Sequence, residues 1–135
     1  MTCFWDGILN ALEPNDFTML SRTYGRFTVH TKPTNKNFVK LLKENNSKTN
    51  HIKWQGTILS DKELDENFIH IKNFDVNSIS KGYYCSTCDP FLCLISKIFK
   101  VNIIHKYLKN TIEYTNTSSK KTIHFSSNRG HFWKT

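Results

Sequence analysis

The sequence lacks several features that would place it in a membrane or outside a cell. No apolar run approaches the roughly 18 residues that a membrane-spanning helix needs, so we expect no membrane association. The N-terminus also lacks a basic region followed by an apolar segment, so no signal peptide is evident. We therefore expect a protein of the reducing cytoplasm, or of a particle assembled there. The four cysteines are accordingly expected to be free thiols.

Motifs of cofactor and metal chemistry are missing as well. The sequence has no glycine-rich phosphate loop, no HExxH and no calcium-loop spacing, so we expect no cofactor. Cys85 and Cys88 form a CxxC pair, but a structural zinc site needs a second pair of ligands. A dithiol redox site usually places its first cysteine at the start of a helix, whereas here Asp89 and Pro90 open the helix. We expect a loop that packs two small side chains, with zinc and redox chemistry as less favoured alternatives.

Acidic residues are scarce in the second half of the chain. Residues 1–67 hold 9 Lys and Arg against 8 Asp and Glu, whereas residues 68–135 hold 10 against 3. This basic half fits an acidic protein partner or a nucleic-acid backbone, and equally a solvated face that keeps the chain soluble. Nucleic acid would be bound through backbone electrostatics, because an arginine-rich helix is absent. The late cationic residues are Lys97, Lys100, Lys106, Lys109, Lys120, Lys121, Arg129 and Lys134.

The patterns that are present predict one α+β domain over residues 1–135. A chain of 135 residues with 38% hydrophobic residues can bury a single core. Helix starts are marked by Thr34, by Ser60 with Glu63, and by Asp89 before Pro90. We expect N-terminal helices packed on a small, mostly antiparallel C-terminal sheet. The expected helices are 3–12, 35–45, 61–73 and 90–99; the expected strands are 101–107 at the sheet centre, 111–114, and a hairpin of 122–125 with 131–133, and residues 26–30 also allow a strand.

Two residues near the ends of the chain suggest thiol chemistry. Cys3 opens the first expected helix, where unpaired N–H groups and the helix dipole favour a thiolate. His131 follows Gly130 in the last expected strand, and an imidazole beside a thiol is the usual base of a cysteine nucleophile. The alternatives are a small buried residue near a terminus and an edge-strand histidine. His105 and His124 also lie on expected strands and compete for the role of base.

Three stretches together resemble the ovarian-tumour (OTU) family of papain-like cysteine proteases. Residues 3–12 are similar to its nucleophile helix, residues 82–104 to its apolar helix and central strand, and residues 122–133 to its closing hairpin with a histidine-aromatic pair. The resemblance implies a papain-like fold, with Cys3 as nucleophile and His131 as base. It also implies ubiquitin, a ubiquitin-like protein or a viral protein as substrate. Heavy use of Asn, Lys, Ile and Thr suits the AT-rich genome of a large DNA virus or of an AT-rich protist, and a divergent viral member of the family is one expectation.

The sequence departs from the family in two places. The family usually carries Asp-Gly-x-Cys, but only two residues precede Cys3, and Asp6-Gly7 follows it. Trp133 stands where the family often has an Asn or Asp that orients the histidine. These departures favour an alternative, an inactive scaffold that acts as a structural or interaction protein, such as a minor virion component. A third interpretation is a basic nucleic-acid-associated domain. A basic ubiquitin tail would call for acidic guides, for which the candidates are Asp61, Glu63, Asp65 and Glu66.

Overall fold

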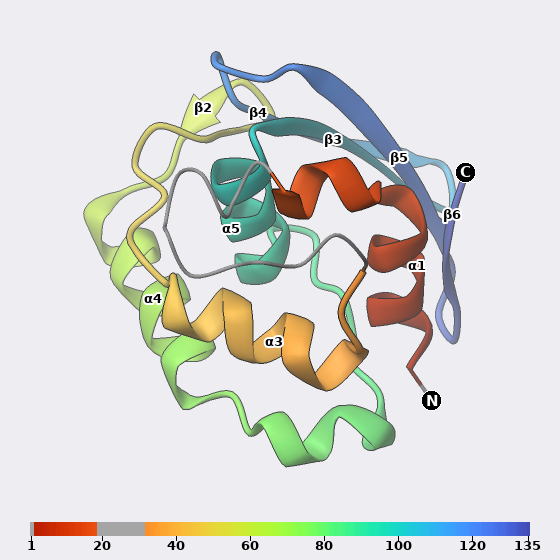
Figure 1. Cartoon of the computed structure of the whole chain (residues 1–135). Coiled ribbons are helices and arrows are strands. Elements are labelled where there is room, and N and C mark those ends of the chain that lie inside the picture. The colour runs from red at the N-terminus through yellow and green to blue at the C-terminus, as the bar shows by residue number, and fades with distance from the viewer. Residues whose placement is uncertain (1, 19–31) are drawn as a thin grey trace.

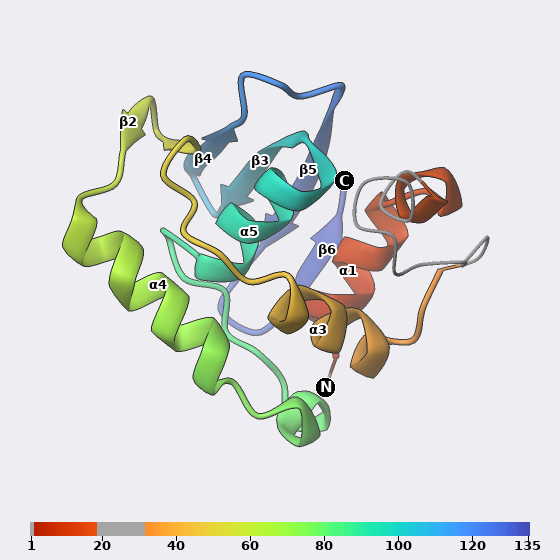
Figure 2. The ribbon, with the colours of Figure 1, turned by 60° about the vertical axis from the view of Figure 1, so that its left-hand side comes forward.

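Six strands form one sheet, and the helices lie against one of its faces (Figures 1 and 2). The structure is a computed structural model that describes residues 2–18 and 32–135. The strand that the sequence allows at residues 26–30 lies outside the described residues. The expected α+β class and mostly antiparallel sheet are confirmed. Within residues 2–18 and 32–135, no helix combines the length and apolar character that crossing a membrane requires.

The sheet has the strand order β2-β1-β4-β3-β5-β6. Every neighbouring pair is antiparallel except β3 and β5, which run parallel. The interior position expected for residues 101–107 is confirmed, as is the antiparallel hairpin at the end of the chain. The strands are β1 (Lys53–Trp54), β2 (Thr57–Ile58), β3 (Val101–Tyr107), β4 (Asn110–Thr115), β5 (Lys121–Ser127) and β6 (Phe132–Lys134).

Two details of the sheet differ from the sequence prediction. The β1–β2 hairpin was not expected; it turns through Gln55 and Gly56, whose φ angles of 51° and 78° suit the twist of a two-residue hairpin. His131 lies before β6 instead of within it. The reason is a turn in which the Asn128 N–H donates to the His131 carbonyl at 2.9 Å, so that strand pairing begins only at Phe132.

The helices begin where their capping residues predict. The Thr34 side chain accepts a hydrogen bond from an N–H of the next helix, Ser60 and Glu63 form a capping box, and Asp89 caps the helix that Pro90 opens. A 3₁₀ helix after residue 75 and a helical stretch at residues 14–18 were not expected. The helices are α1 (Cys3–Ala11), α3 (Asn35–Glu44), α4 (Asp61–Asn73), η1 (Val76–Lys81) and α5 (Pro90–Phe99).

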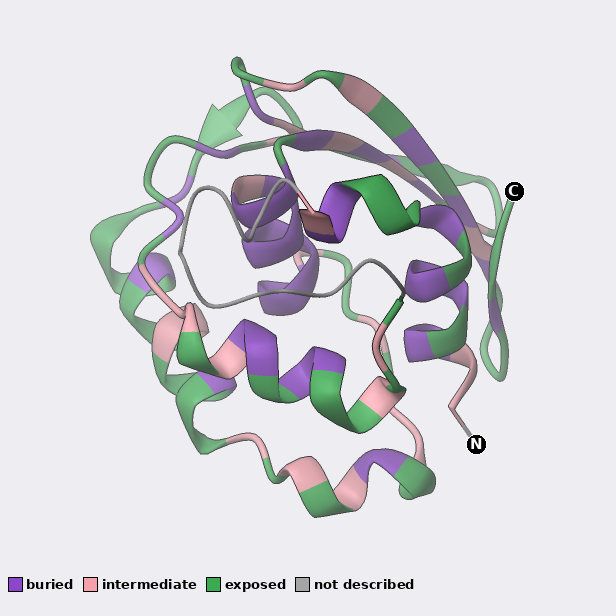
Figure 3. Ribbon diagram, viewed as in Figure 1, coloured by how far each residue is buried: buried purple, intermediate pink, exposed green. Residues whose placement is uncertain are grey.

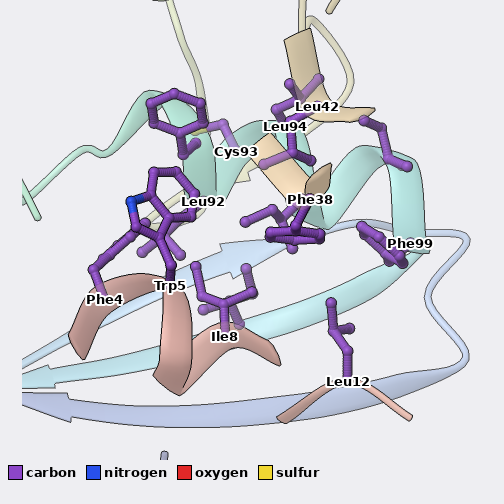
Figure 4. Close-up of a cluster of buried hydrophobic side chains, with 14 of the residues drawn as sticks. Phe4, Trp5, Ile8, Leu12, Phe38, Leu42, Leu92, Cys93, Leu94 and Phe99 are labelled. Carbon is purple, nitrogen blue, oxygen red and sulfur yellow. The ribbon is translucent and has the colours of Figure 1, made fainter. Parts of the chain in front are cut away.

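The core lies between the sheet and helices α1, α3 and α5 (Figures 3 and 4). Trp5 and Ile8 of α1 are fully buried and face side chains of α3 and α5, including Phe38. Burial alternates along β3, where His105 is buried and Lys106 is exposed. One face of the sheet therefore packs on helices while the other meets solvent. This arrangement places the two ends of the chain, α1 and β6, against each other.

Candidate functional site

A pocket of about 290 Å³ lies where several segments of the chain meet. Its walls come from the start of α1, residues 81–87, the end of β3, Ile112 of β4, and residues 127–132. Cys3 and His131 both line it, so the fold brings the two predicted residues to one cavity from opposite ends of the chain. Cys85, His105 and Ser127 line it too. Two thiols and two imidazoles thus share one pocket.

The first turn of α1 is fixed by Asp6. Its Oδ2 accepts a hydrogen bond from Thr2 Oγ1 at 2.8 Å, and its backbone N–H donates to the Thr2 carbonyl at 2.9 Å. Its Oδ1 accepts from Asn35 Nδ2 of α3, also at 2.8 Å. The Thr2 side chain makes no capping hydrogen bond to α1. The Asp that follows the thiol therefore anchors the segment that carries Cys3 without capping its helix.

Gly7 lets α1 lie close to β6. A Cβ atom at this position would stand 2.9 Å from Phe132 Cδ1, closer than side chains normally approach. The Phe132 ring also contacts the Phe4 ring, with centroids 4.8 Å apart. Only glycine permits this separation. The contact with β6 therefore gives a structural reason for Gly7, and so for an Asp6-Gly7 pair that follows Cys3 in the sequence. The contacts of Gly7 and Phe4 with Phe132 thus hold the start of α1 against the beginning of β6.

His131 is exposed and is presented by a short turn. The Asn128 side chain accepts a hydrogen bond from the Gly130 N–H at 3.0 Å, which supports the turn from within. The His131 ring stacks on the Trp133 ring, with centroids 5.2 Å apart and planes at 18°. Since indole offers no hydrogen-bond acceptor, Trp133 holds this imidazole by stacking and cannot polarise it as a carboxylate would.

The thiol and imidazole that are in direct contact inside the pocket are those of Cys85 and His105. Cys85 Sγ lies 3.9 Å from His105 Nδ1, and His105 Nε2 lies 2.6 Å from Ser127 Oγ. Burial raises the pKa of the Cys85 thiol well above its usual range, and the nearby Asp89 carboxyl adds to this. Burial also lowers the pKa of the His105 imidazole. Both groups are therefore held in their neutral forms. The sequence suggested His105 as a competing base, but it gave no sign of Ser127.

The buried Asp89 side chain ties the wall of residues 83–86 to α5. Its carboxyl accepts hydrogen bonds from Tyr83 Oη at 2.8 Å and from the Ser86 N–H at 3.0 Å, in addition to two N–H groups of α5. Burial raises the pKa of this carboxyl, although these hydrogen bonds act in the opposite direction. The capping residue predicted from sequence thus also shapes the pocket.

The remaining sequence candidates lie away from the pocket. His124 is exposed on β5 and does not line it. All four cysteines are free thiols, as expected, and Cys88 and Cys93 pack in and against the core. Within the described residues, no group of three or more His, Cys, Asp or Glu side chains is arranged to hold a metal ion. The acidic residues of α4 do not line the pocket, and α4 lies across the molecule from α1 (Figure 2).

Part of the late positive charge is neutralised within the fold. Asp16, which is only 4% exposed, accepts ion pairs from Lys120 at 3.1 Å and Lys121 at 2.7 Å. Lys97 donates hydrogen bonds to the Ser47 hydroxyl and to a backbone carbonyl. The charge count of the second half therefore overstates the positive charge that is free to meet a partner.

Models of protein families, curated proteins and solved structures were compared with this chain, and none of them matches it. The functional assignment of the pocket consequently depends on the chemistry of its own residues.

Proposed function

We propose that the chain is a cysteine protease of the OTU-like, papain-like type, with Cys3 as nucleophile and His131 as general base. The observation that carries the proposal is that the first residue of the first helix and the residue before the last strand line the same pocket. Cys3 is half-buried and His131 is exposed, so a substrate can reach both. Nucleophilic catalysis by cysteine requires a thiol and an imidazole base at one site, and both groups line this pocket.

The chemistry would follow from these positions. Cys3 transfers its proton to His131, and its sulfur attacks a peptide or isopeptide carbonyl. N–H groups in the first turn of α1, which the Thr2 side chain does not cap, stabilise the oxyanion. When the tetrahedral intermediate collapses, His131 gives its proton to the leaving amine. Water, deprotonated by His131, then cleaves the thioester and restores the Cys3 thiol.

The alternative is a binding protein on the same scaffold, without turnover. The stacking of His131 on Trp133 favours it, because no carboxylate or amide two residues after His131 orients the imidazole. A nucleic-acid-associated domain is weaker, because Asp16 pairs with two of the late lysines. If the protein is a nucleic-acid-associated domain, its affinity for nucleic acid in a retention assay should fall steeply as the salt concentration rises.

The proposed substrate is the tail of another protein. Ubiquitin, a ubiquitin-like protein and a viral protein are the candidates from the family resemblance. The acidic guides suggested for a basic ubiquitin tail lie on α4, where Asp65 pairs with Lys48 and Glu63 belongs to a capping box. These residues do not line the pocket, so they offer a basic tail no support there.

The test is hydrolysis of fluorogenic reporters that carry a ubiquitin tail or unrelated peptide sequences. We expect Cys3→Ala to reduce turnover to background, and His131→Ala to reduce it at least about a hundredfold. Cys85→Ala is the matched control, since it removes a thiol from the same pocket and should retain most of the activity. Turnover by Cys3→Ala at the wild-type rate would refute the protease assignment. Wild-type protein that turns over no reporter and leaves Cys3 unlabelled by an electrophilic ubiquitin probe would support the binding-protein alternative.

A further inference from the structure

Among the described residues, two exposed cationic side chains line the pocket wall. Lys81 lines it at the end of η1, and Arg129 lines it from the turn before β6; both are exposed. No Asp or Glu of the described residues lines it. The ion pairs found within the described part of the chain involve neither Lys81 nor Arg129. Their charges therefore act on whatever enters the pocket.

The buried carboxyl group of Asp89 does not cancel this charge. Asp89 is buried behind the wall, where Tyr83 and Ser86 donate hydrogen bonds to its carboxyl. Its position under the wall keeps it out of reach of a ligand in the cavity. A ligand would thus meet the cations directly and the carboxylate only through a layer of protein.

Aromatic surface accompanies the two cations. Tyr84 is 86% exposed, an unusual value for so large a side chain, and it lines the pocket. Tyr107 and Phe132 contribute further aromatic lining. Tyrosine and arginine are the residues that dominate protein recognition surfaces, because they combine large contact area with hydrogen bonding. The wall is suited to an extended chain that carries negative charge beside apolar groups.

We propose that this pocket selects an extended acidic peptide segment, with Lys81 and Arg129 as the residues that determine this specificity. The inference rests on the proposed function for the idea that substrate enters here. The proposal follows from charge complementarity and implies that a basic ubiquitin tail is disfavoured. A peptide suits the site better than a nucleic acid, because Cys3, the proposed nucleophile for a carbonyl carbon, lines the same pocket.

Binding to the Cys3→Ala protein tests the proposal without any need for turnover. Fluorescein-labelled ten-residue peptides with acidic, neutral and basic sequences, and a single-stranded oligonucleotide of similar charge, are titrated and followed by anisotropy. The double variant Lys81→Glu/Arg129→Glu is compared with Lys40→Glu/Lys109→Glu, which makes the same change in net charge at exposed residues outside the pocket. Thermal unfolding by circular dichroism checks that each variant is folded.

We expect the acidic peptide to bind best and the pocket variant to weaken it by about tenfold or more, since each exposed ion pair can contribute up to about fivefold. The control variant should change the affinity for the acidic peptide by less than about twofold. Equal loss in both variants would overturn the assignment to this pocket, and so would preference for the basic peptide or the oligonucleotide. If wild-type protein cleaves reporters but shows no acidic preference, this inference fails and the protease proposal stands. If the protein binds the acidic peptide but the wild type turns over no reporter, this inference stands and the protease proposal fails.

Discussion

Two thiols share the pocket, but their environments differ. Cys3 stands at the start of a helix, whereas Cys85 lies against the neutral imidazole of His105 and close to the buried carboxyl of Asp89. A negative neighbour and a poorly hydrated site both oppose formation of a thiolate. Contact with an imidazole is therefore insufficient to identify the nucleophile, because the charge around the sulfur also decides its reactivity.

Alkylation rates should separate the two thiols. At pH 8 we expect iodoacetamide to modify Cys85 in the folded protein at least about tenfold more slowly than in the chain unfolded in guanidinium, where an ordinary cysteine pKa of about 8.5 applies. The reason is that burial raises the pKa of Cys85. Time courses of peptide mass spectrometry measure both sites in one sample, with Cys3 as the internal comparison. Folded Cys85 reacting as fast as unfolded Cys85 would contradict this prediction.

At the scale of single elements, local signals in the sequence predicted where helices begin better than they predicted which strands pair. The box of Ser60 with Glu63 and the Asp89-Pro90 pair act within one turn of helix, so their helices begin where expected. The β1–β2 hairpin was missed because each strand has only two residues, too few to show an alternating pattern, although Gly56 marked a turn. The parallel pairing of β3 with β5 depends on the whole chain path and has no local signature.

The candidate site shows the same division. Cys3 and His131 could be singled out by residue type and by the helix and strand patterns around them. The contact of His105 with Ser127 could not, because it joins neighbouring parallel strands whose pairing the sequence does not reveal. The close approach of α1 to β6 at Gly7 was equally invisible, since a glycine in a helix reads first as a weak position.

Gly7→Ala should test how α1 is held against β6. Alanine favours a helix by about 1 kcal/mol, but overpacking against the buried Phe132 ring costs about 1–3 kcal/mol, so we expect net destabilisation of up to about 2 kcal/mol. The displaced helix would also move Cys3 relative to His131 and lower any turnover. Denaturant unfolding and reporter hydrolysis measure the two effects.

Gly130→Ala is the control for the Gly7 substitution, because a Cβ there meets no atom within 4 Å. Its stability should change little. Relief of the Gly7→Ala defect by a second change, Phe132→Leu, would confirm that the ring is the obstacle. A Gly7→Ala protein as stable as wild type would show that α1 and β6 adjust freely, which would remove the structural reason given for Asp6-Gly7.

At the scale of the whole molecule, distant segments are joined by a few charged contacts. Asp16 follows α1 in the sequence, yet its carboxyl pairs with Lys120 and Lys121 at the start of β5. Asp6 connects α1 to α3 through Asn35 in a similar way. The segment that carries the proposed nucleophile is thereby linked both to the sheet and to the helical layer. Stability at this scale should depend on the ionisation of Asp16.

Asp16→Asn should destabilise the protein in a manner that depends on pH. Burial acts to raise the pKa of Asp16, but the hydrogen bonds and ion pairs from Lys121 and Lys120 outweigh it and hold the pKa below the ordinary value of 3.8. A carboxyl with a lowered pKa in the folded state stabilises above its unfolded pKa, and the contribution is lost as pH falls through the folded value. We expect a loss of about 1.5–3 kcal/mol at pH 7 that shrinks below about pH 4 and continues to shrink as Asp16 becomes protonated in the folded protein.

Urea unfolding of both proteins at a series of pH values measures this difference. His105, whose pKa burial lowers, also costs stability in acid, but it is present in both proteins and cancels when they are compared. Asp65→Asn is the matched control, because it removes a carboxylate from an exposed pair with Lys48 and should change stability little at any pH. A deficit in Asp16→Asn that stayed constant down to pH 2 would mean that the two lysines do not stabilise the fold through the charge of Asp16. In that case the link between the start of the chain and β5 would rest on packing, and the position of α1 beside the pocket would be insensitive to acid.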